Sequence, residues 1–315
     1  MNRGRFVNRP YEIIHPVHDG DAYESRKDEL NSLYEKFKYR RQTMKNTVHM
    51  LKSITNIQMM SFVITTEDDK VILIDGGWPQ DMPYLVEYLQ GLTGKEVPTV
   101  HAWILTHPHN DHIRGFIELM EGNPDALDVQ KIYYNFPSAQ FIAREDLDTA
   151  AAEMYRILPL IAHKCCIVSG GDELDVGAAH FEFYYSPDSE FTHNVCNNAS
   201  LVFRMTLGGK TVLFTGDAGV EAGKKILRMY GGTGKLKADY VQMAHHGQNG
   251  CERDFYEEVA PKGCFWCAPD WLWNNDAGKG YNTHVFKTIE VRGWMDEIGA
   301  TENYVIMNGT QVVEL

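Results

Sequence analysis

The chain has 315 residues, enough for one large domain or two ordinary ones, and its 43% hydrophobic and 23% charged residues suffice for a full core. The formal net charge of -13 weighs against a protein that binds nucleic acid through bulk electrostatics. It does not exclude a protein that binds nucleic acid in a local basic groove. The N-terminus lacks the apolar segment of a signal peptide, and no run approaches a membrane span in length. We therefore expect a cytoplasmic protein without membrane contact.

Residues 1–50 form the first predicted segment, a helical extension that packs on the main body. A charged helical pattern starts at Asp19 and continues through Lys45, with apolar residues such as Leu30 and Leu33 at helical spacing. The pattern changes to strands after this segment. We therefore divide the chain into the extension and a main domain over residues 51–315.

The main domain alternates between strand and helix patterns. Residues 60–66 and 71–75 predict a hairpin whose second strand is buried, and Pro79 opens a helix. The remaining predicted elements are strands at 100–105, 131–135, 180–185, 199–206, 211–214 and 240–244, helices at 113–121, 144–162, 221–230 and 284–298, and a closing hairpin around Asn308-Gly309. This alternation indicates a layered architecture of sheets flanked by helices.

Three imidazoles and a carboxylate occur within six positions directly after the apolar run at 102–105. These residues are His107, His109, Asp111 and His112. A strand that ends there places their side chains at the rim of a sheet, where open-sheet proteins have their sites. Imidazole nitrogen and carboxylate oxygen suit divalent zinc, iron, manganese or cobalt. The segment therefore predicts a metal site.

Further acid and imidazole residues follow other predicted strands. Asp75 ends the strand at 71–75, Asp217 follows the strand at 211–214, and His245-His246 follows the strand at 240–244. A single aspartate at a strand end is more often a turn residue than a ligand. Several such positions in one chain of alternating strands and helices indicate instead that they share the predicted site.

Four motifs together resemble those of the metallo-β-lactamase-fold hydrolases, over roughly residues 54–315. They are Asp75-Gly76-Gly77, His107-x-His109-x-Asp111-His112, Thr215-Gly216-Asp217 and His245-His246-Gly247. The Asn197-Asn198 pair before a strand, together with His-His-Gly, is similar to the branch related to the hydrolase-like domain of the competence protein ComEC, which includes phosphorylcholine esterases. The resemblance implies an αββα four-layer sandwich with two divalent metal ions at the rim between its sheets, zinc foremost and manganese or iron as alternatives.

The resemblance also implies the ligands of the first metal. His107 and His109 would bind it, and Asp217 would bridge both metals. Most of the superfamily adds a third histidine before the bridging aspartate, in a region where this chain offers His193, Asn194, Asn197 and Asn198. Either His193 supplies this ligand or an asparagine replaces it, and an amide oxygen moves the preference towards harder cations such as manganese. Asn197 and Asn198 are otherwise expected to support the ligands.

The second metal would be bound by Asp111, His112 and one histidine of the His245-His246 pair. Adjacent strand residues point to opposite sides, so only one of the pair is expected to face the metals. We favour His245 as the ligand and His246 as a catalytic residue, a proton donor or substrate contact. Asp111 would also orient the attacking hydroxide or accept its proton. Asp75 would hydrogen-bond a ligand histidine.

The predicted function is a dinuclear metal-dependent hydrolase, in which a metal-bridging hydroxide attacks a small-molecule phosphoester or phosphodiester. The same hydroxide suits a lactone, lactam or thioester, which gives a second hypothesis. A third hypothesis, a metal-containing binding or sensor protein with little turnover, follows from the altered third-histidine position.

Overall fold

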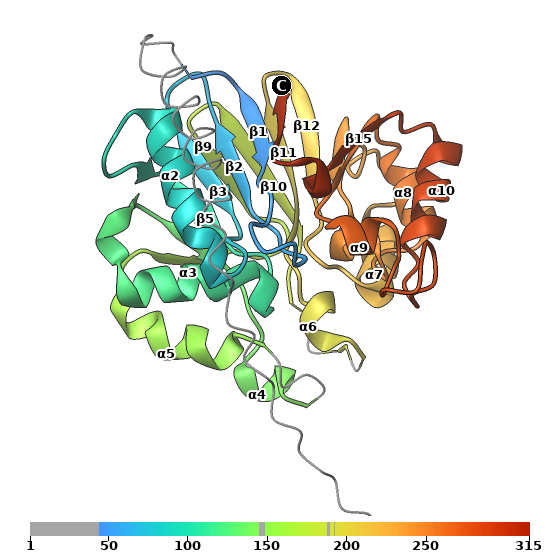
Figure 1. Ribbon diagram of the computed structural model, residues 1–315, viewed down its shortest axis with the longest axis horizontal. Helices are drawn as coiled ribbons and strands as arrows, with labels where there is room; N and C mark the ends of the chain where they lie inside the picture. Colours follow the sequence, from blue (N-terminus) through green and yellow to red (C-terminus); the bar gives the residue numbers. More distant parts are fainter. Residues whose placement is uncertain (1–43, 145–148, 188–189, 192) are drawn as a thin grey trace, which may run out of the picture. The chain divides into compact units, whose positions relative to one another are not determined.

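The computed structural model describes residues 44–144, 149–187, 190–191 and 193–315, and within them two seven-stranded sheets (Figure 1). In spatial order, the first sheet contains β16 (Gln311–Glu314), β1 (Thr47–Met50), β2 (Phe62–Thr65), β3 (Val71–Ile74), β5 (Ala102–Ile104), β7 (Ile132–Tyr134) and β8 (Cys165–Ile167). The second contains β15 (Glu302–Val305), β14 (Gly263–Trp266), β13 (Tyr240–Gln242), β12 (Lys210–Phe214), β11 (Val202–Leu207), β10 (Ala179–Tyr185) and β9 (Glu173–Val176).

Helices cover the outer face of each sheet, as Figure 1 shows. Beside the first sheet lie α2 (Met82–Thr93), α3 (Asn110–Gly122) and α5 (Ala151–Ile161), and beside the second lie α7 (Val220–Tyr230), α8 (Arg253–Val259) and α10 (Thr288–Ile298). The short helices are α4 (Ala139–Ile142), α6 (Val195–Asn198) and α9 (Asp270–Trp273), with 3-10 turns η1 (Pro79–Asp81), η2 (Pro124–Ala126), η3 (Ala244–Gly247) and η4 (Ile306–Asn308). Among the described helices, none is both long and apolar enough to cross a membrane.

Three apolar cores separate these four layers. On β3, Ile72 and Ile74 face the core between the sheets, whereas Leu73 faces the core under α2 and α3. On β12, Phe214 faces the core between the sheets and Leu213 faces the core under α7 and α8. Because both faces are buried throughout β3 and over residues 212–214 of β12, each of these positions requires an apolar residue, which explains the continuous apolar runs. The predicted αββα sandwich is confirmed.

The strand predicted at 100–105 is divided in the structure. β4 (Thr99–Val100) pairs with β6 (Asp128–Val129) in a small separate sheet, and β5 pairs with β3. His101 lies between them, where its main-chain NH donates to Val71 O (2.8 Å) and its Nδ1 accepts from Val71 N (3.1 Å). One residue therefore uses both polar groups of Val71, and this interrupts the regular pairing.

The prediction of a closing hairpin is wrong, because the last two strands pair in different sheets. β15 pairs with β14 in the second sheet, whereas β16 pairs with β1 in the first. Asn308-Gly309 is thus a crossover between sheets, with Gly309 at φ 95. Each of the two strands covers a β-strand edge that would otherwise leave its NH and CO groups unpaired.

Three helix boundaries also differ from the predictions. α3 begins at Asn110 rather than at residue 113, which places Asp111 in its first turn. α5 begins at Ala151 rather than at 144, and α10 at Thr288 rather than at 284. Residues 145–148 lie outside the described part of the chain.

Most of the predicted helical extension at 1–50 lies outside the described residues. Its last four residues are not helical, because Thr47–Met50 form β1 between β16 and β2 in the first sheet. The first sheet therefore takes β1 from the last four residues of the predicted extension, which lie beyond the charged helical pattern.

Stability is expected to fall in mild acid because of His49 on β1. Its Nδ1 lies 2.8 Å from Tyr88 Oη, and burial lowers the pKa of His49 from 6.5 to about 4. As the pH falls from 6.5 to 4, the imidazole of His49 takes up a proton in the unfolded chain before it does so in the folded protein. The free energy of unfolding therefore falls by about 3 kcal/mol over this range. Urea unfolding at pH 7 and pH 4.5 should show a larger loss in the wild type than in His49→Gln. Equal losses would contradict this account.

Candidate metal centre

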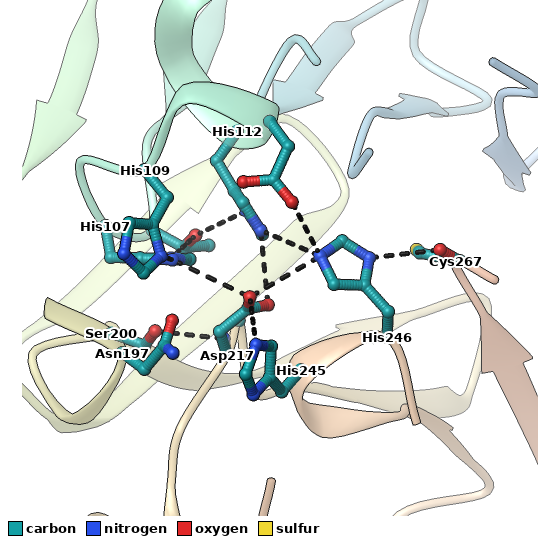
Figure 2. A network of polar contacts seen from close by, with 12 residues as sticks. His107, His109, His112, Asn197, Ser200, Asp217, His245, His246 and Cys267 are labelled. Carbon is teal, nitrogen blue, oxygen red and sulfur yellow. Dashed lines mark hydrogen bonds and ion pairs between the residues drawn. The ribbon is translucent and has the colours of Figure 1, made fainter. Parts of the chain in front are cut away.

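The candidate metal centre lies at the strand ends between the two sheets (Figure 2). Asp75 directly follows β3, and His107 follows β5. Asp217 follows β12, and His246 lies in η3 after β13. The structure thus brings together residues from all four predicted motifs.

One buried group contains Asp111, His112, Asp217 and His246, whose potential ligand atoms all lie within 4.8 Å of one another. His246 Nε2 is 3.1 Å from Asp111 Oδ2 and 3.4 Å from Asp217 Oδ2. His112 Nε2 is 3.2 Å from Asp217 Oδ1. Two imidazoles and two carboxylates that converge in this way form a donor set for a divalent metal ion.

A second group contains His107, His109 and Asp217, again with potential ligand atoms within 4.8 Å. His107 Nε2 is 2.9 Å from His109 Nδ1 and 3.8 Å from Asp217 Oδ2. Asp217 therefore belongs to both groups, and Figure 2 shows it with histidines arranged around its carboxylate. A carboxylate has two oxygens, so one residue in this position fits a pair of cations.

Hydrogen bonds set the ring nitrogen that each buried histidine presents. His112 Nδ1 lies 2.6 Å from Asp75 Oδ2, and Asp75 in turn accepts from Thr106 N (2.8 Å) and Thr106 Oγ1 (2.6 Å). His246 Nδ1 lies 3.0 Å from the main-chain oxygen of Cys267. Both acceptors place the proton on Nδ1, so each Nε2 keeps its lone pair for a metal. Such partners strengthen metal binding.

The charges of the buried groups depend on one another. Burial alone would raise the pKa of Asp217, but the charges of His112 and His246 hold it well below its ordinary value. Burial opposes the charged form of His246, yet Asp217 and Asp111 raise its pKa to about 9. The buried carboxylates thus require positive charge beside them. Because metal ions supply that charge in place of protons, their binding should release protons.

The His245-His246 pair is not part of a strand, so the alternation argument does not apply to it. β13 ends at Gln242, and both histidines have left-handed backbone, with φ 52 and φ 56. His246 is fully buried and joins the metal group, whereas the His245 side chain is 19% exposed with Nε2 3.8 Å from Asp217 Oδ2. The geometry favours His246 as the ligand and His245 as the residue open to substrate, the reverse of the sequence-based preference.

Left-handed backbone occurs at several positions in and near this centre. Asp75 has φ 52, alongside the two histidines, and Asn194 has φ 49. Residues with a β-carbon adopt this conformation only where the surrounding structure enforces it, and such strain occurs most often at functional sites.

In the third-histidine region, Asn197 and Asn198 are buried and His193 is exposed. His193 is exposed and belongs to neither metal group among the described residues. Both ends of the Asn198 side-chain amide are hydrogen-bonded within the protein. Its Nδ2 donates to His193 O (2.9 Å), and its Oδ1 accepts from Ala222 N (3.0 Å). Asn197 is buried, and its Nδ2 donates to Asn194 Oδ1 (2.9 Å).

The Oδ1 atom of Asn197 has no hydrogen-bond partner in the described part of the chain. Figure 2 shows the Asn197 side chain on the side of the cluster where His107 lies. A buried amide oxygen without a donor costs about 1–3 kcal/mol. A cation would satisfy it, so the residues present fit a metal ion better than they fit an empty, uncharged space.

Two supporting side chains escaped the sequence analysis. Ser200 Oγ accepts a hydrogen bond from Asp217 N (2.9 Å), and Gln58 Nε2 donates one to Asp111 Oδ2 (3.0 Å). Ser200 directly follows the asparagine segment, so its proximity was a usable signal. Gln58 lies in no motif.

The chain is similar to known proteins in sequence and in structure. Residues 55–140 match the metallo-beta-lactamase superfamily. The metallo-beta-lactamase fold protein YhfI from Bacillus subtilis aligns with a TM-score of 0.53 and 15% identity, over 85% of this chain and 99% of that protein. The chain has the metallo-β-lactamase fold.

Two further proteins are similar to this chain, one in structure and one in sequence. CmlA, a diiron β-hydroxylase from Streptomyces venezuelae, aligns with a TM-score of 0.55 and 12% identity, over 91% of this chain and 60% of that protein. In sequence, the chain is 28% identical over 176 residues to ComE operon protein 3 of Bacillus subtilis (strain 168). That match covers 54% of this chain and 20% of the relative, so the chain matches about a fifth of the relative's length.

Proposed function

We propose that the metallo-β-lactamase domain is a dinuclear metal-dependent hydrolase of phosphoesters or phosphodiesters. The observation that carries the proposal is the shared carboxylate of Asp217, which belongs to both groups of potential ligands. Two bound cations would lower the pKa of a water between them and offset negative charge on the reacting oxygen.

In this proposal the remaining ligands divide into two sets. The first set is His107, His109 and Asn197, and the second is Asp111, His112 and His246. Asp111, whose Oδ2 faces His246 and Gln58, would also orient the attacking hydroxide or accept its proton. His245 contacts the substrate from the exposed side.

The phosphoester assignment is supported by the chemistry of the ligands. An amide oxygen from Asn197 is a harder ligand than imidazole, and hard cations bind phosphoryl oxygens well. The match to ComE operon protein 3 supports the ComEC-like branch, which was inferred from the asparagine pair and the His-His-Gly motif. We propose zinc as the resident metal, with manganese or iron as alternatives at the Asn197 site.

We also propose a cytoplasmic location. All six cysteines are free, four of them buried, as expected in a reducing compartment.

A comparison of substrates tests the proposed function. The metal-loaded wild type should hydrolyse bis(p-nitrophenyl) phosphate faster than a chromogenic lactone or lactam, and His109→Ala should lose this activity. His180→Ala is the matched control, because this histidine lies on the surface of β10 and pairs with Asp175 (2.7 Å).

Faster hydrolysis of the lactone or lactam would contradict the phosphoester assignment but would still support a metal-dependent hydrolase. Two bound metals without hydrolysis of any ester would contradict the hydrolase itself and favour a metal-containing binding protein.

A further inference from the structure

Two glutamine side chains, from Gln58 and Gln248, are hydrogen-bonded to each other beside the candidate metal centre. Gln58, in the connection between β1 and β2, donates from Nε2 to Asp111 Oδ2 (3.0 Å). Gln248, two residues after His246, donates from Nε2 to Gln58 Oε1 (3.3 Å). Asp111 Oδ2 also lies 3.1 Å from His246 Nε2. Since the main chain connects His246 to Gln248, these contacts close a ring. The ring joins a carboxylate ligand and an imidazole ligand through two amides.

Main-chain hydrogen bonds hold both glutamines in place. The Gln58 main-chain oxygen accepts from Trp78 Nε1 (2.9 Å), and two residues later Met60 N donates to Asp111 O (3.1 Å). Gln248 is 3% exposed, and its main-chain NH donates to His245 O (2.9 Å). Neither amide therefore stands on a freely moving loop.

The polarity of the ring follows from the carboxylate. An ionised carboxylate only accepts hydrogen bonds, so Gln58 must turn its NH2 group to Asp111 and its oxygen to Gln248. Gln248 must then turn its own NH2 group to Gln58. This leaves Gln248 Oε1 buried without a partner among the described residues. A flipped Gln248 amide would only set two oxygens against each other.

We propose that Gln58 and Gln248 are positioning residues that fix the rotation of the Asp111 carboxylate. Through this carboxylate they set the affinity of the second set of ligands for its metal ion. The inference rests on the proposed dinuclear centre. Gln248 acts only through Gln58, because its amide contacts Gln58 rather than the carboxylate. Loss of a hydrogen bond to a metal ligand typically weakens metal binding about 10–100-fold.

Zinc titration of the chelator-stripped full-length protein tests this arrangement. Gln58→Met keeps the volume of the side chain and removes both hydrogen bonds, so the affinity of the second site should fall about 10–100-fold. Gln248→Met should cause a smaller loss. The double variant should bind zinc as weakly as Gln58→Met alone, because the two residues act in series.

Gln90→Met on α2 is the matched control and should bind zinc as the wild type does, since its amide donates to Glu96 O (2.7 Å) at the surface, away from the candidate metal centre. If Gln58→Met fails to fold, Gln58→Asn keeps the polarity, is one methylene too short to reach Asp111, and carries the same expected loss.

Wild-type affinity in Gln58→Met, or losses that multiply in the double variant, would overturn the proposal. The readout is zinc affinity, so it separates this inference from the proposed reaction. The expected pattern in a protein that hydrolyses no phosphodiester would support the glutamine pair and contradict only the substrate. A wild type that binds no second zinc would overturn both.

Discussion

Replacing Asp217 with alanine is expected to lower the metal content from about two equivalents per chain to one or fewer, and to reduce phosphodiester hydrolysis by about 1,000-fold or more. The reason is that Asp217 belongs to both groups of potential ligands and is the acidic neighbour of His107, His112 and His246. Charge stabilisation by metals supplies several kcal/mol of the barrier, and a loss of about 4 kcal/mol corresponds to about 1,000-fold. Elemental analysis and initial rates measure the two effects.

Asp175→Ala is the matched control, because its carboxylate is exposed on β9 and pairs with surface His180. It should keep the metal content and the rate of the wild type. An Asp217→Ala protein that retains two metals and full activity would show that this carboxylate does not bridge the centre.

The two neighbouring histidines should behave differently when each is replaced by alanine. His246→Ala should lose the second metal equivalent, because its Nε2 lies in the buried group beside Asp111 and Asp217. His245→Ala should keep both metals, and its rate should fall about 100-fold through loss of a substrate contact. Metal content measured together with kcat separates the two residues. Metal loss in His245→Ala with retention in His246→Ala would restore the assignment made from sequence.

Much of the fold follows from local pattern. β3 and the last three residues of β12 are buried on both faces, so they form continuous apolar runs, and these runs mark both strands within one residue. Each run is followed by an aspartate, Asp75 or Asp217, at the rim where parallel strands end. The histidine motif is equally visible, because its spacing on a strand end and the first turn of α3 brings the donors together.

Other features depend on contacts that no local pattern records. The crossing of Asn308-Gly309 between sheets depends on which strand edges remain open after the rest has folded. The choice between His245 and His246 depends on a turn in which His245 N donates to Gly216 O (3.1 Å), far away in the sequence. Gln58 reaches Asp111 from the connection between β1 and β2, which contacts η1 through a hydrogen bond from Ile54 N to Asp81 Oδ1 (2.8 Å).

The central claim is that one chain holds two metals bridged by Asp217. Elemental analysis of untagged protein purified without chelators, with zinc or manganese supplied, tests it most directly. We predict about two equivalents per chain in the wild type and about one in Asn197→Ala, because the orphaned amide oxygen of Asn197 is proposed to complete the first set of ligands. One equivalent or none in the wild type under both metals would contradict the claim.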